Sequence, residues 1–247
     1  MMQRRRRRQV TVAAAPTVTP GAVLELIAAK AAGGTAPGSN DPLTTQWFDT
    51  SGNGHHGTLT GFSGTPWGGT GTAADPYALT FDGSNDYVQL PELGAASAGG
   101  VFSHEAWFLG GSITSDRALT CEGNTGGTSP YVEMQLATLG YLRVVTRASG
   151  RTTTTLTGTE NLSDGVWHHA VATSDGTDAR LYVDGALVRG PAPISVGSYA
   201  TINSAALGAR RLSTVDRYFN GKIAVARVYP FALTPEQVAV NYAAGLR

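Results

Sequence analysis

Residues 180–189 read RLYVDGALVR, and this stretch is the clearest structural signal in the chain. Two short runs of strand-forming residues flank the pair Asp184-Gly185. Both central residues of a type I′ turn need a positive φ, which Asp and Gly tolerate. The stretch therefore predicts a β-hairpin that turns at Asp184 and Gly185.

Similar strand signals lie on both sides of this hairpin at short, regular spacing. Each is a run of aliphatic, aromatic or Thr residues that stops at Gly, Ser, Asn, Asp or Pro. The predicted strands cover residues 78–81, 87–90, 102–109, 131–136, 141–147, 166–173, 179–183, 186–189, 205–208 and 219–229. Many short strands with turns about every 8–12 residues predict an all-β sandwich or barrel.

One helix and one ambiguous segment complete the predicted elements. Thr234 supplies an N-cap hydroxyl, Pro235 the first helical position and Gln237 the third, and Gly245 ends the helix. Residues 23–29 fit both a helix and a strand, because their apolar residues satisfy either spacing. Residues 33–45 are rich in Gly, Pro, Ser and Asn, which predicts a loop.

Length and composition limit the class of protein. The 247 residues suit a single large β domain, with residues 1–20 as a basic N-terminal arm and residues 21–247 as the folded part. The net charge is zero, so no long-range field draws nucleic acid or a membrane to the molecule. Cys121 is the single cysteine, which excludes an intrachain disulfide and a Cys-based metal site. We expect it to act as a small buried hydrophobe.

The N-terminal arm carries an unbroken basic run, which consists of Arg4, Arg5, Arg6, Arg7 and Arg8. One interpretation is a solvated, disordered tail, and the other is an arm that docks on an acidic partner. The apolar run that follows, residues 10–15, is short and interrupted by Thr11, unlike a signal peptide. We therefore expect the arm to be retained. Apolar stretches stay well below the roughly 18 residues that a membrane span requires.

Four stretches, taken in order, resemble the laminin-G-like branch of the concanavalin A-like lectin/glucanase superfamily. They are residues 48–59 (FDTSGNGHHGTL), 79–88 (LTFDGSNDYV), 167–172 with 180–185 (WHHAVA and RLYVDG), and 219–229 with 232–237 (FNGKIAVARVY and ALTPEQ). The resemblance implies an all-β jelly-roll sandwich of two antiparallel sheets with a short C-terminal helix. It also implies that residues 23–29 form a strand.

An enzymatic role is not expected. Some members of this superfamily hydrolyse β-glucans with two carboxylates of a Glu-x-Asp-x-x-Glu pattern on one strand, and a retaining pair lies about 5–5.5 Å apart. Here Glu105-Ala106-Trp107 and Glu133-Met134-Gln135 each provide one carboxylate. A serine-nucleophile elbow is also absent from the sequence. His168 and His169 are adjacent, so they point to opposite faces of their strand.

Two turns are candidates for a metal site. Asp82, Asn85 and Asp86 cluster in one turn, and Asp49 and Asn53 in another. The resemblance suggests a structural calcium ion near such loops, and calcium needs about 6–8 oxygen ligands. Alternatively, these side chains hydrogen-bond the amides of their own turns. Ala224-Val225-Ala226 stand where the family carries an acidic residue, which argues against a carboxylate site there. His55 and His56 are expected to belong to a polar loop.

Sugar sites in lectins combine aromatic faces with Asn and Asp groups. The aromatic candidates here are Trp47, Trp67, Tyr77, Tyr131 and Tyr199. Most aromatic residues in such folds lie in the core, and the sequence does not separate the two roles.

We expect a non-enzymatic structural or attachment protein of a bacteriophage virion, of the minor tail or capsid decoration type. Its sandwich would bind surface glycans, its arginine arm would dock on other virion proteins, and it would form a homo-oligomer in the assembly. The alternative is a secreted or cell-surface, calcium-dependent carbohydrate-binding module. Neither hypothesis requires a cofactor beyond a structural calcium ion, and neither involves a membrane or specific nucleic acid.

Overall fold

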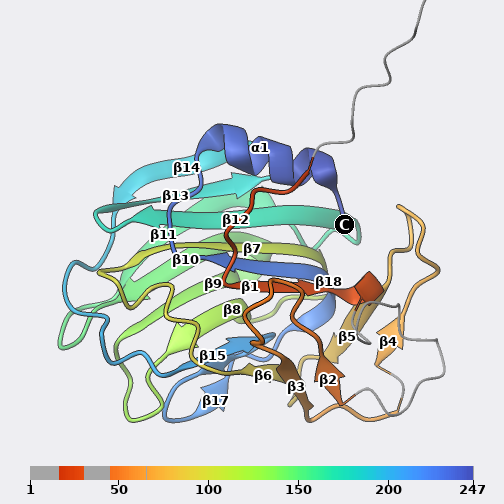
Figure 1. The fold of residues 1–247 in the computed structure, drawn as a ribbon, viewed down its shortest axis with the longest axis horizontal. Coiled ribbons are helices and arrows are strands. Elements are labelled where there is room, and N and C mark those ends of the chain that lie inside the picture. The colour runs from red at the N-terminus through yellow and green to blue at the C-terminus, as the bar shows by residue number, and fades with distance from the viewer. Residues whose placement is uncertain (1–16, 31–44, 65, 247) are drawn as a thin grey trace, which may run out of the picture.

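The computed structural model describes residues 17–30, 45–64 and 66–246. Within these residues two large antiparallel sheets stack along the line of sight of Figure 1. Sheet A has the order β14 (Ala186–Pro193), β13 (Asp178–Val183), β12 (Trp167–Asp175), β7 (Val101–Gly110), β18 (Asn220–Tyr229), β5 (Ala78–Asp82) and β4 (Trp67–Gly68), with β1 (Leu24–Ile27) beside β18. Sheet B has the order β11 (Thr154–Asn161), β10 (Tyr141–Arg147), β9 (Tyr131–Ala137), β8 (Arg117–Gly123), β15 (Ser204–Leu207), β6 (Tyr87–Leu90), β3 (Gly57–Thr60) and β2 (Gln46–Trp47).

The core lies between the two sheets and follows the alternation of the strands. β9 directs Val132, Met134 and Leu136 inward, while β7 contributes Phe102 and Phe108 from the other sheet. Each fully buried side chain of this size contributes about 1.5–3 kcal/mol to folding. The predicted jelly-roll sandwich is confirmed, with every predicted strand present within a few residues of its expected bounds.

The predicted hairpin is present as β13 and β14. Asp184 and Gly185 form its turn with φ of 49° and 80°. These values are the positive φ angles that a type I′ turn requires.

The ambiguous segment near the start forms a strand and then a single helical turn. β1 covers Leu24–Ile27 and pairs with β18, so the strand that the resemblance implied is confirmed and the helical alternative is wrong there. A short 3₁₀ turn, η1 (Ala28–Lys30), follows the strand. Pairing with β18 decides between two sequence patterns that are equally satisfied locally.

The C-terminal helix α1 (Pro235–Ala244) begins and ends as predicted. The Thr234 hydroxyl accepts a hydrogen bond from the Gln237 amide, and the Gln237 side chain accepts one from the Thr234 amide, which is a complete capping box. Tyr242 of α1 stacks on Trp107 of sheet A, with ring centroids 5.5 Å apart. The helix therefore packs on the outer face of sheet A, towards its β13–β14 end in Figure 1. Within the described residues, helices are too short or too polar to cross a membrane.

The segment between β15 and β18 is not an ordinary connection. Residues 208–219, here called the covering loop, include the small hairpin of β16 (Arg210–Arg211) and β17 (Val215–Asp216). The loop is closed at its base, because the Phe219 amide donates to the Gly208 carbonyl at 2.8 Å. Gly208 has a φ of 79°, and an added Cβ would lie 2.3 Å from the Phe81 ring. Glycine is thus required where the chain leaves β15 and turns back over sheet B.

Candidate functional site

The turn proposed as a metal site uses its side chains on its own backbone. Asp82 Oδ1 accepts hydrogen bonds from the amides of Ser84 (2.7 Å) and Asn85 (3.3 Å), and Asp86 Oδ2 accepts one from the Asp82 amide (3.0 Å). Burial raises the pKa of Asp86. Within the described residues, no group of three or more His, Cys, Asp or Glu side chains could hold a metal ion. The contacts correspond to the Asx-turn alternative, and calcium binding stays a prediction.

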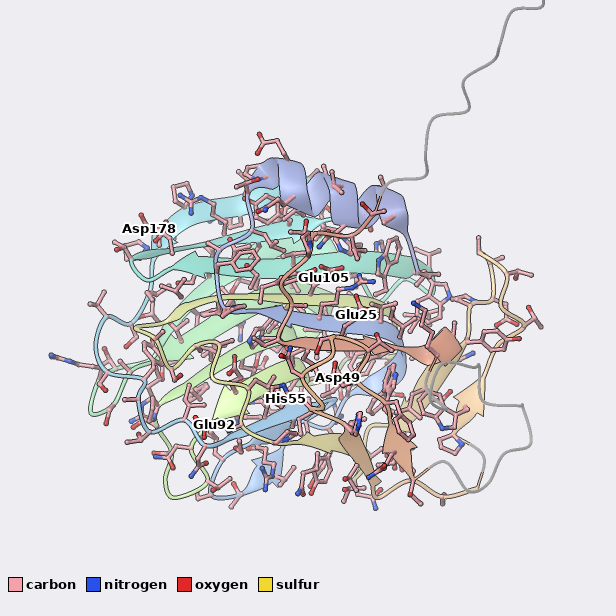
Figure 2. The ribbon with its side chains drawn as sticks, viewed as in Figure 1. Glu25, Asp49, His55, Glu92, Glu105 and Asp178 are labelled. Atoms are coloured by element: carbon pink, nitrogen blue, oxygen red, sulfur yellow. The ribbon has the colours of Figure 1, made fainter. Side chains whose placement is uncertain are left out.

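The Asp49 turn also has a structural role. Asp49 Oδ1 accepts from the amides of Glu25 and Ser51 at 2.9 Å, and Oδ2 accepts from the His55 amide at 2.9 Å. Burial alone would raise the pKa of Asp49, but these hydrogen bonds outweigh it and lower the value. The His56 ring accepts a bond from the Asp49 amide. The turn joins β1 to the rest of the sandwich, as Figure 2 shows for Glu25, Asp49 and His55.

A charged cluster lies on the outer face of sheet A, beneath α1. Glu105 of β7 contacts Arg227 of β18 (2.7 Å), His169 of β12 (3.3 Å) and Asn241 of α1 (2.6 Å). All four side chains are buried. Burial alone would raise the pKa of Glu105, but His169 and Arg227 lower it to about 2. Glu25 completes the cluster from β1, 3.0 Å from Arg227 (Figure 2). This cluster anchors the helix and offers no surface to a ligand.

Glu105 and Glu133 lie on opposite sides of the sandwich. Glu105 is on the outer face of sheet A, whereas Glu133 is on the outer face of sheet B, in register with Cys121 and Val145. The two carboxyls that the sequence singled out therefore cannot act on one bond. Cys121 beside Glu133 is buried, as predicted, and burial raises the pKa of its thiol.

The outer face of sheet B, by contrast, carries a polar network that reaches solvent. Arg217 of the covering loop donates from Nη1 to Glu133 Oε2 at 2.9 Å and to the Gln135 side-chain oxygen. The same Nη1 lies 3.9 Å from Asp116 Oδ2, and Arg143 Nη1 lies 3.1 Å from that oxygen. Arg217 has a φ of 55°, a left-handed conformation that is costly for a residue other than glycine. Arg217 thus links the covering loop to the strands below it.

The covering loop is itself held by charge and aromatic contacts. Arg210 forms a bidentate pair with Asp216, at 2.8 and 2.5 Å, and its guanidinium lies 5.8 Å from the centre of the Tyr131 ring. Leu212 packs with Tyr131 and Val145 on the same face. The loop is therefore a fixed part of the surface.

Three buried polar atoms in this region lack hydrogen-bond partners among the described residues. They are Glu133 Oε1, Gln135 Nε2 and Arg117 Nε. Burial raises the pKa of Glu133 to about 7, even though Arg217 and Arg210 favour its charged form. Unsatisfied buried groups are rare in proteins and concentrate where a ligand or ordered water completes the structure.

An open cleft of about 540 Å³ lies beside this network. We call it the Arg217 cleft. Its lining residues are Thr114, Ser115, Asp116, Arg117, Thr138, Asp216, Arg217 and Tyr218. Tyr218 forms a half-buried aromatic pair with Tyr87 of β6, with ring centroids 6.3 Å apart. Thr138 belongs to η2 (Thr138–Gly140), the turn between β9 and β10. The cleft therefore offers one aromatic side and several charged or hydroxyl groups.

Sequence reasoning missed this cleft. The aromatic residues proposed from the sequence as sugar-binding candidates lie elsewhere. Trp47, Trp67 and Tyr199 are buried in the core, Tyr131 lies beneath Arg210, and Tyr77 is on the side of sheet A. Arg4 to Arg8 fall outside the described residues. A signal was present in residues 209–218, which place three arginines, Asp216 and Tyr218 in one segment without strand alternation. Nothing local, however, indicated which sheet this segment covers.

Comparisons with known proteins agree with this architecture. A family model described as the concanavalin A-like lectin/glucanases superfamily matches residues 82–239. Domain 4 of an extracellular arabinanase from Geobacillus stearothermophilus, solved with arabinotriose, is similar at 20% identity and a TM-score of 0.61, covering 89% of this chain and 97% of that one. A carbohydrate-binding domain of a Ruminococcus gnavus sialidase, solved with α2,3-sialyllactose, is similar at 18% identity and a TM-score of 0.52, covering 66% and 95%.

The botulinum neurotoxin serotype C1 binding domain is similar at 12% identity and a TM-score of 0.61. The match covers 90% of this chain and 51% of that chain, so this protein corresponds to about half of the toxin domain. At these low identities, the structural similarity shows a shared fold. No curated protein sequence matched the chain.

Proposed function

The chain belongs to the concanavalin A-like lectin/glucanases superfamily, and from this premise we propose that it is a glycan-binding module without catalytic activity. The proposal places the ligand in the Arg217 cleft. Similar folds solved with arabinotriose and with sialyllactose support a glycan as the class of ligand.

The observation that carries the proposal is the composition of the Arg217 cleft. Sugars present apolar C–H faces and a rim of hydroxyl groups, so their sites combine an aromatic ring with polar groups that fix orientation. Tyr218 supplies the ring, while Asp116 and Arg217 supply planar groups that can accept from and donate to adjacent hydroxyls. Arg143 and Glu133 hold these groups in place.

The position of the two carboxyls singled out in the sequence supports a role without catalysis. A glycosidase needs a carboxylic acid and a second carboxylate that both reach the glycosidic bond. Glu133 has a pKa suited to a general acid, but its side chain is fully buried beneath Arg217. The neighbouring position of the same strand face carries Gln135, which cannot act as a nucleophile or base.

The proposal is tested by isothermal titration calorimetry of the full chain against a panel of arabinan, glucan, uronate and sialylated oligosaccharides. Tyr218→Ala should weaken binding about tenfold or more, because it removes the aromatic side of the cleft. Tyr242→Ala, on the outer face of sheet A, is the matched control and should bind as the wild type does. Unchanged binding by Tyr218→Ala would place the ligand elsewhere, and no binding to any glycan would refute the function. Release of reducing sugar would refute the non-catalytic part.

The choice between display on a virion and display on a cell is proposed from the sequence. Five consecutive arginines, Arg4 to Arg8, favour docking on an acidic partner of an assembly. Deletion of residues 1–15 should leave the thermal unfolding of the sandwich unchanged and abolish incorporation into particles. Normal incorporation of the truncated chain would refute a docking arm, whereas failure of the full chain to enter particles would favour the cell-surface alternative.

Calcium at Asp82, Asn85 and Asp86 is tested separately. A bound structural ion stabilises the folded state by mass action, so a chelator should lower Tm by several degrees. An unchanged Tm would exclude a structural calcium ion.

A further inference from the structure

The Arg217 cleft lies on a face of the sandwich that is rich in arginine. Of the twelve arginine and lysine residues that the structure describes, six belong to the strands or covering loop of this face. They are Arg117, Arg143, Arg147, Arg210, Arg211 and Arg217. The whole chain has no net charge, so this concentration of arginine is a local property.

The carboxyls on this face do not balance the arginines. Asp216 is engaged by Arg210 through two hydrogen bonds, which leaves Asp116 and Glu133 for Arg143 and Arg217. Arg143 and Arg217 both approach the same oxygen of Asp116. Glu133 is buried, and burial disfavours its negative charge. Positive charge therefore predominates on this face of the sandwich.

Hydrogen-bond donors are also in excess at the cleft. Arg117 uses Nη1 on the carbonyls of Gly83 and Tyr218, while its buried Nε has no partner among the described residues. Gln135 accepts from Arg217 through its oxygen, and its fully buried Nε2 is likewise without a partner there. Arg217 makes its described contacts through Nη1, which leaves its Nε and Nη2 donors unused within the same residues. Glu133 Oε1 is the single unpartnered acceptor of the group.

A cleft on a positive face, with unused donors on Arg217, is matched by a ligand that supplies a negative group with several acceptors. A carboxylate fits the planar fork of arginine, with two parallel hydrogen bonds. We therefore propose that the ligand of the Arg217 cleft is an acidic sugar, and that its carboxylate is bound by Arg217 together with Arg117 or Arg143. This inference rests on the proposed glycan-binding function and adds the class of sugar. Both uronic acids and sialic acids carry this group.

The test compares sugars that differ in the carboxylate alone. Trigalacturonate is paired with its methyl ester, and 3′-sialyllactose with the methyl ester of its sialic acid, by calorimetry at pH 6.0 in 50 mM and 500 mM NaCl. We expect one acidic member to bind at least about tenfold more tightly than its neutral partner. The difference should shrink at high salt, because the cleft is open to solvent. The pair that responds identifies the source of the carboxylate.

Two arginine variants locate the interaction. Arg217→Met and Arg143→Met should each reduce the preference for the acidic member, whereas Arg189→Met on β14 of sheet A is the control and should preserve it. The second variant keeps the test valid where Arg217→Met fails to fold, because Arg143 is partly exposed and, among the described carboxyls, pairs with Asp116 alone.

The outcomes separate this inference from the function on which it rests. Equal or tighter binding of the neutral sugars would overturn the acidic-sugar inference and leave glycan binding intact. An absence of binding to all sugars would refute both proposals. Equally tight binding of poly-glutamate would overturn the inference in favour of a general anion surface, because that polymer carries carboxylates without a sugar.

Discussion

Glu133 makes a quantitative prediction about how stability depends on pH. Its carboxyl is fully buried, and burial raises its pKa from 4.5 to about 7, despite the nearby positive charges of Arg217 and Arg210. Asp216 of the covering loop opposes these charges and adds to the rise. A pKa difference of this size between the folded and unfolded states corresponds to a free energy of about 3 kcal/mol.

The sign follows from proton binding. Between pH 4.5 and about pH 7 the folded chain holds the Glu133 proton, whereas the unfolded chain has released it. Proton release therefore favours unfolding as the pH rises. The contribution of this group is fully present below pH 4.5, falls through the window, and is lost above about pH 7. Glu133→Gln keeps the shape of the side chain and removes the titration.

The assay is urea denaturation followed by tryptophan fluorescence, at one-unit intervals from pH 4.5 to 8.5 and constant ionic strength. Relative to wild type, Glu133→Gln should gain about 3 kcal/mol between the two ends of this range. Glu236→Gln provides the control, because the backbone amide of Glu236 and the Thr234 hydroxyl lower the pKa of that exposed carboxyl. This group titrates below pH 4.5, so the control should run nearly parallel to wild type across the assayed range. Parallel stability curves for wild type and Glu133→Gln would show that Glu133 is not buried as described.

Three further substitutions test the base of the covering loop and the anchoring of α1. Gly208→Ala should destabilise the fold by about 2 kcal/mol or more, since a Cβ would overlap the buried Phe81 ring at positive φ; Gly150→Ala, also at positive φ but with open space around the Cβ, should cost distinctly less in the same urea titration. Thr234→Ala should lower stability by about 1 kcal/mol through loss of the capping box, and an unchanged urea midpoint would contradict the role assigned to that box. Asn241→Leu should loosen α1, because it leaves the buried Glu105 carboxylate without one donor; hydrogen exchange should rise in residues 235–244, and unchanged protection there would mean that Asn241 does not anchor the helix.

Much of the fold could be predicted from local sequence patterns. The Asp184-Gly185 turn, the alternation of strands such as residues 131–136, and the capping box at Thr234 each depend on residues that are neighbours in the chain. Such features are specified by backbone preference and by the burial of every second side chain, so they are visible in a linear sequence. The identification of the superfamily rested on the order of four such stretches.

The Arg217 cleft could not be predicted in this way. Asp116, Thr138 and Arg217 come from three connections far apart in the sequence, and they meet because β8, β9 and β10 are adjacent in sheet B. The surroundings of Glu133 could not be predicted either, because its sequence neighbours resemble those of Glu105. The fold places one carboxyl beneath α1 and the other beneath Arg217, and this difference in surroundings lowers one pKa and raises the other.

Local preference thus accounts for the strands, the turns and the helix ends, because each depends on a few consecutive residues. The site depends on which segment crosses which face of a sheet. That choice is made by long-range contacts, such as Gly208 against Phe81 and Arg217 against Glu133, whose partners are separated by 127 and 84 positions in the chain. The charge and hydrogen-bonding character of the cleft are therefore properties of the tertiary structure, assembled from residues that have no distinctive pattern in the sequence.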